Sequence, residues 1–255
     1  MKTATLVLFS GALTLTLSAC AGQQRRGPPP KVIERVLKTA PGAAQPSTIV
    51  KTEIAFARAA KEDGQYTASL EYAAGGARLH GRNGVVSAAS VFGAARDPET
   101  SAEWAPRTVV MSCDGALALS LGRFQDQEGF VGNYVTTWVR QQDNSYKWVY
   151  DVAGRDNPQP PPRAEFEDGD IVVTAIDAVQ GLVATCPRRG DPVPPPPALP
   201  ITSDDPAQSK LSRDGTLRWR WEHRSDGIKY VAADYYYNGK WVTAIEESLA
   251  SPPEE

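Results

Sequence analysis

Histidine, cysteine and methionine are scarce in this chain of 255 residues, which has 2 histidines, 3 cysteines and 2 methionines. The histidines, His80 and His223, are far apart in the sequence, and no CxxC pair or other metal-ligand spacing occurs. A metal site is therefore not expected. The sequence also lacks the GxSxG, P-loop and GxGxxG motifs, and its serines and cysteines have no nearby histidine to activate them. We expect no cofactor.

Basic charge is also limited, because 27 Lys and Arg residues are outnumbered by 30 Asp and Glu residues, for a formal net charge of −3 at pH 7. Basic residues adjoin only in short pairs such as Arg25-Arg26 and Arg188-Arg189. Binding to nucleic acid depends on clustered Lys and Arg side chains that neutralise phosphates. No nucleic-acid partner is therefore expected.

A sustained apolar run occurs at the start of the chain, over residues 4–17, behind a lysine. The run is too short to span a bilayer comfortably and is typical of a signal peptide. Residues 17–20 read LSAC and resemble a bacterial lipobox, in which residues 1–19 are removed and Cys20 is acylated. Ala21 then favours the outer membrane, facing the periplasm. An ordinary secretory signal with a chance cysteine is the alternative.

Proline-rich and polar segments divide the rest of the chain into parts. After the lipoprotein signal peptide at 1–19, we expect a flexible tether at 20–46, a main domain at 47–155, a proline-rich linker at 156–169, a strand segment at 170–190, a second proline-rich linker at 191–203, a β-hairpin appendage at 204–248 and a tail at 249–255.

Two cysteines remain once Cys20 carries lipid, namely Cys113 and Cys186. An oxidising compartment favours a disulfide between them, which would tie the main domain to the segment after the first proline-rich linker. The alternative is a pair of buried free thiols, which pack as small apolar groups.

The first part of the main domain has helical periodicity. A helix that begins at Ser47 is predicted by Val50, Ile54 and Ala57, which share one face, and Asp63-Gly64 ends it. Two further helices are predicted at 65–74 and 84–95, with a short strand at 77–80 between them.

The period changes to two after Glu103, which predicts strands. The predicted strands are 107–111, 116–124 and the two that flank the turn at 143–145, followed in the appendage by strands within 170–185, from 216 onward and at 240–245. Helices followed by strands predict an α+β fold, with helices packed on a curved antiparallel sheet and a C-terminal antiparallel β appendage docked on it.

Several stretches carry a resemblance to a known superfamily. They read GQYTASLEYAA, EWAP, MSCDGALALSLGRF and YVTTWVRQQDNSYKWVYD. Their order resembles the superfamily of nuclear transport factor 2, ketosteroid isomerase and the SnoaL-type polyketide cyclases, and most of all an exported bacterial branch of it. The resemblance covers residues 47–154 and implies a cone-shaped α+β domain. It does not imply one activity, because this fold supports unrelated reactions and binding modules.

Enzymes of that superfamily place a carboxylate or an Asp–His pair inside the cone, so the resemblance makes Asp151, Glu71 and His80 the candidate catalytic residues. Each also has a simpler interpretation. Asp151 can form a local salt bridge, Glu71 can be a solvated charge on a helix, and His80 can be a structural histidine. No complete counterpart of the superfamily's catalytic constellation is present, and no catalytic residue is assigned.

Aromatic residues of the main domain could line a cavity for a small apolar ligand, although core packing is the common role of aromatics in strands. The candidates are Trp104, Tyr134, Trp138, Trp148 and Tyr150. The sequence therefore predicts a cell-envelope protein, anchored to the membrane through acylated Cys20, with a non-catalytic ligand-binding or assembly module. The alternative is a small-molecule isomerase, dehydratase or cyclase that uses a pocket carboxylate. A homodimer, formed through the open face of the sheet, or an envelope protein partner is also considered.

Overall fold

The computed structural model describes residues 31, 44–161, 178–188, 192–199 and 209–251. Over these residues the chain has an α+β fold, with a seven-stranded mixed sheet, a separate four-stranded antiparallel sheet and a few helices. The predicted signal peptide, Cys20 and most of the predicted tether lie outside the described residues. Within them, no helix is both long enough and apolar enough to cross a membrane.

The main domain contains helices α2, α3 and α4 and strands β1 to β6. Their bounds are α2 (Pro46–Glu62), α3 (Gln65–Tyr72), β1 (Ala73–Gly81), β2 (Gly84–Ser87), α4 (Ala88–Phe92), β3 (Glu103–Met111), β4 (Leu117–Gln125), β5 (Val131–Arg140) and β6 (Tyr146–Arg155). The later strands are β7 (Gln180–Val183), β8 (Ser209–Leu211), β9 (Leu217–His223), β10 (Lys229–Tyr237) and β11 (Lys240–Leu249). The four strands predicted after Glu103 in the main domain are confirmed; β3 begins earlier than predicted, and β4 is shifted by one residue.

Helices α2 and α3 begin and end close to where the sequence predicts. Pro46 occupies the first turn of α2, where a missing backbone N–H costs nothing. Gly64, with φ of 106°, forms the sharp connection to α3, which side chains with a Cβ rarely allow. Asp97 then caps α3 from a distant loop, because its carboxylate accepts from the backbone N–H of Tyr66 and of Thr67.

The buried face of α2 differs from the predicted one. Val50, Ile54 and Ala57 are not its core, and the Ile54 side chain is 54% exposed. The helix instead buries Ile49, Glu53 and Ala60. The three residues that signalled the helix share a face that is only partly buried, whereas the helix turns the Glu53 carboxylate inward.

The predicted helix over 84–95 is only partly correct. Residues 84–87 form β2, in which Val85 and Val86 pair with His80 and Leu79 of β1. β-branched side chains favour a strand here because a neighbouring edge is available. The helix is limited to α4, which Ser87 caps by accepting a hydrogen bond from Ser90 N at 3.4 Å.

The large sheet is mixed, not antiparallel as predicted. Its strand order is β2-β1-β6-β5-β4-β3-β7. The pairs β1/β6 and β3/β7 are parallel, and the other pairs are antiparallel. Each parallel pair joins strands that are distant in sequence, as parallel pairing requires. The prediction paired only strands that are consecutive in the sequence. It therefore missed the parallel pairs β1/β6 and β3/β7, whose strands are far apart in the sequence.

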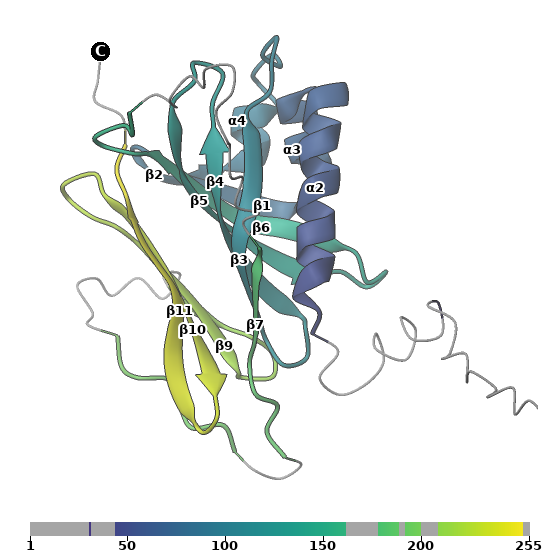
Figure 1. The fold of residues 1–255 in the computed structure, drawn as a ribbon, viewed down its shortest axis with the longest axis vertical. Coiled ribbons are helices and arrows are strands. Elements are labelled where there is room, and N and C mark those ends of the chain that lie inside the picture. Colours follow the sequence, from purple (N-terminus) through teal and green to yellow (C-terminus); the bar gives the residue numbers. More distant parts are fainter. Residues whose placement is uncertain (1–30, 32–43, 162–177, 189–191, 200–208, 252–255) are drawn as a thin grey trace, which may run out of the picture.

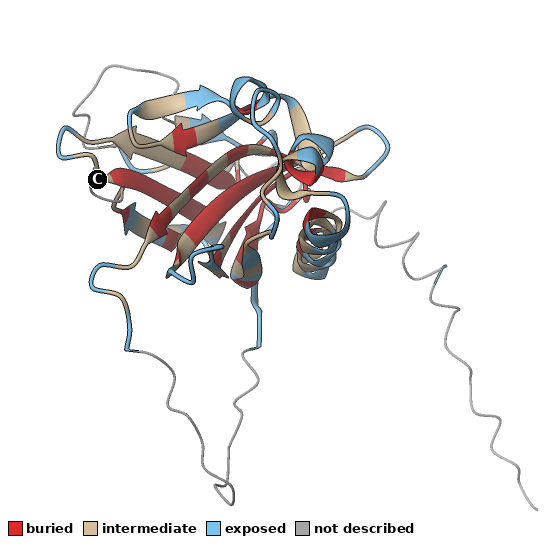
Figure 2. Cartoon of the chain, turned by 90° about the horizontal axis from the view of Figure 1, so that it is seen from above, coloured by how far each residue is buried: buried red, intermediate tan, exposed pale blue. Residues whose placement is uncertain are grey.

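Figure 1 shows the helices and the four-stranded sheet on opposite sides of the seven-stranded sheet. The buried residues follow the central strands, and the helices turn exposed residues outward (Figure 2). The cluster on the helix side is Ile49, Ala77, Ala88, Val109, Met111, Ala118, Trp138, Tyr146 and Trp148. The cluster between the sheets includes Val110, Leu119, Val135, Tyr150 and Val152 from one sheet and Leu217, Trp219, Val231, Ala233 and Ile245 from the other.

The four-stranded sheet has the order β11-β10-β9-β8, so the appendage docks on the main domain as predicted. Cys113 and Cys186 are joined by a disulfide with a Cα–Cα distance of 5.1 Å. The second proline-rich segment follows this sheet, because Trp241 Nε1 donates to Pro194 O at 2.9 Å. Because the appendage covers one face of the large sheet, a homodimer would need a surface other than that face.

Candidate functional site

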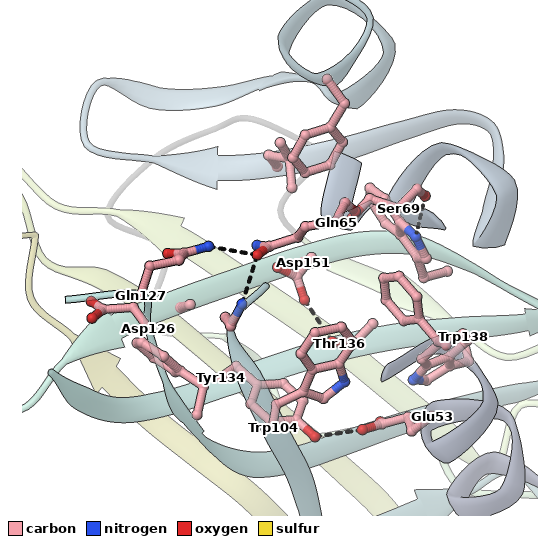
Figure 3. A pocket seen from close by; sticks show the side chains of 17 residues that line it. Glu53, Gln65, Ser69, Trp104, Asp126, Gln127, Tyr134, Thr136, Trp138 and Asp151 are labelled. Atoms are coloured by element: carbon pink, nitrogen blue, oxygen red, sulfur yellow. Dashed lines mark hydrogen bonds between the residues drawn. The ribbon is translucent and has the colours of Figure 1, made fainter. Parts of the chain in front are cut away.

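A cavity of about 230 Å³ lies on the helix side of the large sheet. Residues from α2, α3, α4, strands β1 and β3 to β6, and the turn between β4 and β5 line it (Figure 3). They are Glu53, Phe56, Gln65, Ser69, Leu79, Phe92, Ala102, Trp104, Phe124, Asp126, Gln127, Tyr134, Thr136, Trp138, Trp148, Asp151 and Ala153. The volume lies just below the ~300–1,000 Å³ of typical small-molecule sites, so a small ligand fits best.

A register shift in β6 brings Asp151 to the cavity. Trp138 pairs with Trp148, and Thr136 pairs with Asp151, so one extra residue separates the partners on β6. Such a bulge reverses the alternation of side chains along one strand. Trp148 and Asp151 therefore face the cavity, while Tyr150 between them faces the C-terminal sheet.

Glu53 is the most deeply buried acid of the site, with 1% of its surface exposed. The Tyr134 hydroxyl donates a hydrogen bond to Glu53 Oε2. The other oxygen, Oε1, is buried and has no hydrogen-bond partner among the described residues. The Ser120 hydroxyl lies near enough to Glu53 to lower the pKa of this acid, although the hydrogen bond that it donates in the structure is to Thr136 O at 3.4 Å. An unpaired buried acceptor is costly, which makes Oε1 an expected contact point for a ligand or water.

Gly122 positions Tyr134. It lies opposite Tyr134 in the β4/β5 pair, and a Cβ at this position would lie 2.5 Å from Tyr134 Cζ. Real side chains do not approach so closely. The absence of a side chain at Gly122 therefore gives the Tyr134 ring the space from which its hydroxyl reaches Glu53.

Asp151 is held by its cross-strand neighbour. Thr136 Oγ1 donates to Asp151 Oδ1 at 2.6 Å. Lys229 of the C-terminal sheet approaches from the other side, where its ammonium donates to Ala153 O at 2.6 Å. Burial lowers the pKa of Lys229 to about 8, and Asp151 opposes that change.

Burial raises the pKa of both acids. The pKa of Glu53 rises to about 7, mainly because burial disfavours its charged form and also because Asp151 is negative, although the Ser120 and Tyr134 hydroxyls offset part of the rise. Burial likewise raises the pKa of Asp151 to about 6, against the Thr136 hydrogen bond and the charge of Lys229. Near neutral pH the site can therefore hold or release protons.

Polar contacts form the rim of the cavity. Gln65 Oε1 accepts from Ala102 N at 2.8 Å and from Gln127 Nε2 at 2.7 Å, which links α3 to the turn after β4 (Figure 3). Asp126 is neutralised by Arg155, whose Nε lies 2.6 Å from its carboxylate. Glu53 and Asp151, inside the cavity, have no such counter-ion among the lining residues, because the described lining contains no Lys, Arg or His.

The structure brings together most of the predicted pocket aromatics. Trp104, Tyr134, Trp138 and Trp148 line the cavity. Tyr150 does not, because the bulge turns it into the core between the sheets, so this part of the prediction was wrong.

Of the candidate catalytic residues, only Asp151 lines the cavity. Glu71 is exposed on α3, and its backbone oxygen accepts from Lys147 Nζ. It borders a separate polar depression between α2 and the β5/β6 turn. His80 is buried between the sheets, away from the cavity lining.

His80 joins the two sheets. Its Nδ1 lies 2.6 Å from the Tyr150 hydroxyl, and its Nε2 lies 3.0 Å from His223 Nδ1. Burial lowers the pKa of His80 to about 4, with smaller contributions from His223 and Lys229. The histidine is therefore neutral near pH 7 and serves as a hydrogen-bonded part of the core. The described residues contain no group of three His, Cys, Asp or Glu side chains that could hold a metal ion.

Glu53 is the principal residue that sequence reasoning missed. A signal was present, because Ile49, Glu53, Phe56 and Ala60 follow helical spacing with a single acid among apolar residues. An acid inside such a stripe is either an exposed charge or a buried functional group. The neighbouring face, with Val50 and Ile54, appeared more apolar and was preferred.

Comparisons of the chain with models of protein families and with curated proteins give no match.

Proposed function

We propose that this protein binds a small molecule in the cavity between its helices and its large sheet. One observation carries the proposal: a cavity of about 230 Å³ whose aromatic lining contains a buried carboxyl oxygen, Glu53 Oε1, without a partner. Structural cores are filled and their polar groups are paired. An unfilled space with an unpaired polar atom is what a binding site is expected to contain.

The likeness to nuclear transport factor 2 and its relatives agrees with this proposal. We infer that residues 47–155 form a cone-shaped domain of that kind, with its helices against one face of a curved sheet. Helix α2 contributes Ile49 to the cluster that also contains Met111 and Trp138 of the sheet, which supports this inference. The C-terminal sheet lies on the opposite face and leaves the cavity side uncovered by it (Figure 1).

A fragment screen by ligand-observed NMR tests binding. Small aromatic fragments should show saturation transfer from the full-length chain. A variant that fills the cavity, Ala102→Phe, should abolish it, because Ala102 lines the cavity. The exposed substitution Glu62→Gln is the control. If no fragment binds in a manner sensitive to Ala102→Phe, while both variants remain folded by near-ultraviolet circular dichroism, the proposal is wrong.

A second candidate function is acid–base catalysis on a small substrate, of the isomerase, dehydratase or cyclase type. The specific observation that favours it is the pair of carboxyl groups with pKa values of about 7 for Glu53 and about 6 for Asp151. At a pH between these values Asp151 can accept a proton while Glu53, beside the Tyr134 hydroxyl, can donate one.

Deuterium exchange separates this second function from binding alone. A ligand recovered from the protein after incubation in D₂O should carry deuterium on carbon if Asp151 removes and returns a proton. Asp151→Asn should prevent the exchange while the ligand is still retained. Retained ligand with no deuterium in the wild-type protein would leave binding as the function and exclude proton transfer on that ligand.

We further propose that the protein is lipid-anchored through Cys20 in the cell envelope, on the outer membrane facing the periplasm. The support is the sequence LSAC at residues 17–20 after an apolar run. A Cys20→Ser variant should lose its fractionation with membranes. Unchanged fractionation of that variant would show that the anchor is elsewhere or absent.

A further inference from the structure

The cavity lining contains buried carboxylate acceptors and no basic side chain among the described residues. Glu53 and Asp151 both project into it, from α2 and from β6 (Figure 3). Their protein partners are two hydroxyl donors, from Tyr134 and Thr136. Glu53 Oε1 remains unpaired in a residue that is 1% exposed. A ligand that completes this site must donate hydrogen bonds.

The nearby cations are directed elsewhere. Arg155 pairs with Asp126 at the rim and with Glu128 in the adjoining turn. Lys229 donates to Ala153 O from the side of the C-terminal sheet and is not among the residues that line the cavity. A ligand with a carboxylate or phosphate would therefore meet two buried acids with no cation in the described lining to compensate it.

The aromatic side chains of the lining favour a positively charged ligand. Six aromatic side chains besides Tyr134 surround the space, namely Phe56, Phe92, Phe124, Trp104, Trp138 and Trp148. The negative face of an aromatic ring attracts a cation, most strongly for Trp. The same rings bury the apolar part of a ligand.

We propose that the ligand of this cavity is a small organic cation with N–H donors, such as a protonated primary amine on an apolar or aromatic frame. This inference rests on the proposed binding function and names its ligand class. The ammonium group would donate to Glu53 Oε1 and to the free oxygen of Asp151. The apolar frame would lie among the Trp and Phe rings.

Binding of such a cation should change the protonation of the site. A positive charge beside Glu53 and Asp151 lowers the pKa of both acids, so protons are released as the amine enters. The groups that face this pair are the hydroxyls of Tyr134, Ser120 and Thr136, the Trp138 indole and, from the far side of β6, Lys229. Asp126, at the rim, is paired with Arg155. Affinity for the amine should therefore rise with pH between about pH 5 and pH 8.

Three probes of matched shape test the charge preference. They are phenethylamine, the neutral 2-phenylethanol and the anionic 3-phenylpropionate, titrated against the full-length chain at pH 8. Phenethylamine should bind at least tenfold more tightly than the alcohol, and 3-phenylpropionate should not bind measurably. Calorimetry in two buffers of different ionisation enthalpy should detect proton release with the amine at pH 6.5 and none with the alcohol.

Variants connect the preference to the two acids. Glu53→Gln and Asp151→Asn keep the shape of each side chain and remove its charge, so each should weaken phenethylamine binding by about 10- to 100-fold, the range of hydrogen bonds to charged groups. Binding of 2-phenylethanol should change by less than threefold. Glu62→Gln, at the exposed end of the same helix, should leave both affinities unchanged.

The outcomes separate the ligand class from the binding function. Equal or tighter binding of 2-phenylethanol or 3-phenylpropionate, lost in Ala102→Phe, would overturn the amine proposal and keep the small-molecule site. Amine binding that survives both charge-removing substitutions would also overturn it. If none of the three probes binds to a correctly folded protein, the amine proposal fails, and the fragment screen with Ala102→Phe decides separately whether the binding function fails as well.

Discussion

The two faces of the seven-stranded sheet are packed differently, although the same strands form both. One face packs against the C-terminal sheet as a filled core, in which His80 is hydrogen-bonded to Tyr150 and His223, although Thr137 Oγ1 and Trp219 Nε1 are buried without a partner among the described residues. The other face packs against helices and leaves a cavity in which Glu53 has an unpaired oxygen. A single strand such as β6 thus supplies Tyr150 to a filled core and Asp151 to an open site.

The two faces also differ in how their buried groups affect stability. The filled face is reinforced by a disulfide and by a buried ion pair between Arg218 and Asp234, 2.7 Å apart, within the C-terminal sheet. The open face contains two acids whose charged forms are disfavoured. Groups that cost stability persist where they serve binding or chemistry. Removal of the buried charge of Glu53 should therefore stabilise the protein, whereas removal of the disulfide should destabilise it.

The largest effect should come from the disulfide on the filled side. A Cys113→Ser, Cys186→Ser double variant opens a loop of 73 residues, and the chain-entropy model gives a loss of about 4 kcal/mol in the free energy of unfolding. Urea denaturation of the oxidised protein measures this. The wild-type protein in reductant is the control and should lose a similar amount. A loss below about 1 kcal/mol would show that the docked sheet does not depend on the bridge.

The second largest effect should be an increase in the free energy of unfolding at neutral pH when Glu53, on the open side, is replaced by Gln. The pKa of Glu53 is about 7 in the folded chain and 4.5 ordinarily, so the folded protein keeps a proton that the unfolded chain releases. The resulting stabilisation is complete below pH 4.5 and is lost as pH rises to 7, a change of about 3 kcal/mol. Glu53→Gln should remove this loss.

The measurement for Glu53 is urea unfolding at pH 4.5, 5.5 and 7.5. The free energy of unfolding of Glu53→Gln, relative to the wild-type protein, should increase steadily with pH. Glu62→Gln, exposed on the same helix, should follow the wild type throughout. A constant difference between Glu53→Gln and the wild type would mean that folding does not raise the pKa of Glu53.

His80, on the filled side, should show the opposite pH dependence. Its pKa is about 4 in the folded chain and 6.5 ordinarily, so the unfolded chain takes up a proton first as pH falls. The stability that depends on neutral His80 should decline by about 2 kcal/mol between pH 6.5 and pH 5. The wild-type advantage over His80→Asn should shrink by that amount in urea unfolding. An advantage that grows toward pH 5 would contradict a buried neutral histidine.

A smaller effect should follow from Gly122→Ala. The added methyl would lie 2.3 Å from the backbone oxygen of Ala105 and 2.5 Å from the Tyr134 ring, so both must shift, which costs about 1–3 kcal/mol and moves the Tyr134 hydroxyl relative to Glu53. Thermal unfolding and the near-ultraviolet signal of Tyr134 would report this. Gly75→Ala is a matched control, because a Cβ there meets no atom within 4 Å. Equal effects of the two substitutions would remove the positioning role of Gly122.

The sequence was most informative where local patterns decide the structure. Period-two alternation predicted strands β3 to β6, and Asp63-Gly64 ended helix α2 as expected. Trp104, Tyr134, Trp138 and Trp148 were named as pocket candidates because they are aromatic residues of predicted strands, and Asp151 was named because of the resemblance to a known superfamily.

What could not be predicted depends on distant partners. The parallel strands β1 and β7 add to the sheet through contacts with residues far along the chain. The bulge that turns Tyr150 away from the cavity has no clear sequence signal, because one inserted residue leaves the amino-acid pattern nearly unchanged. Glu53 was missed because the apolar pattern of a helix indicates its buried face, and a buried acid interrupts that pattern.

The central claim is that the open face holds a buried pair of carboxyl groups poised to exchange protons. Carbon-13 NMR titration of the side-chain carboxyls in the full-length chain tests it most directly, with Glu53→Gln and Asp151→Asn for assignment. We expect a pKa of about 7 for Glu53 and about 6 for Asp151. Values near the ordinary 4.5 and 3.8 for these two groups would contradict it.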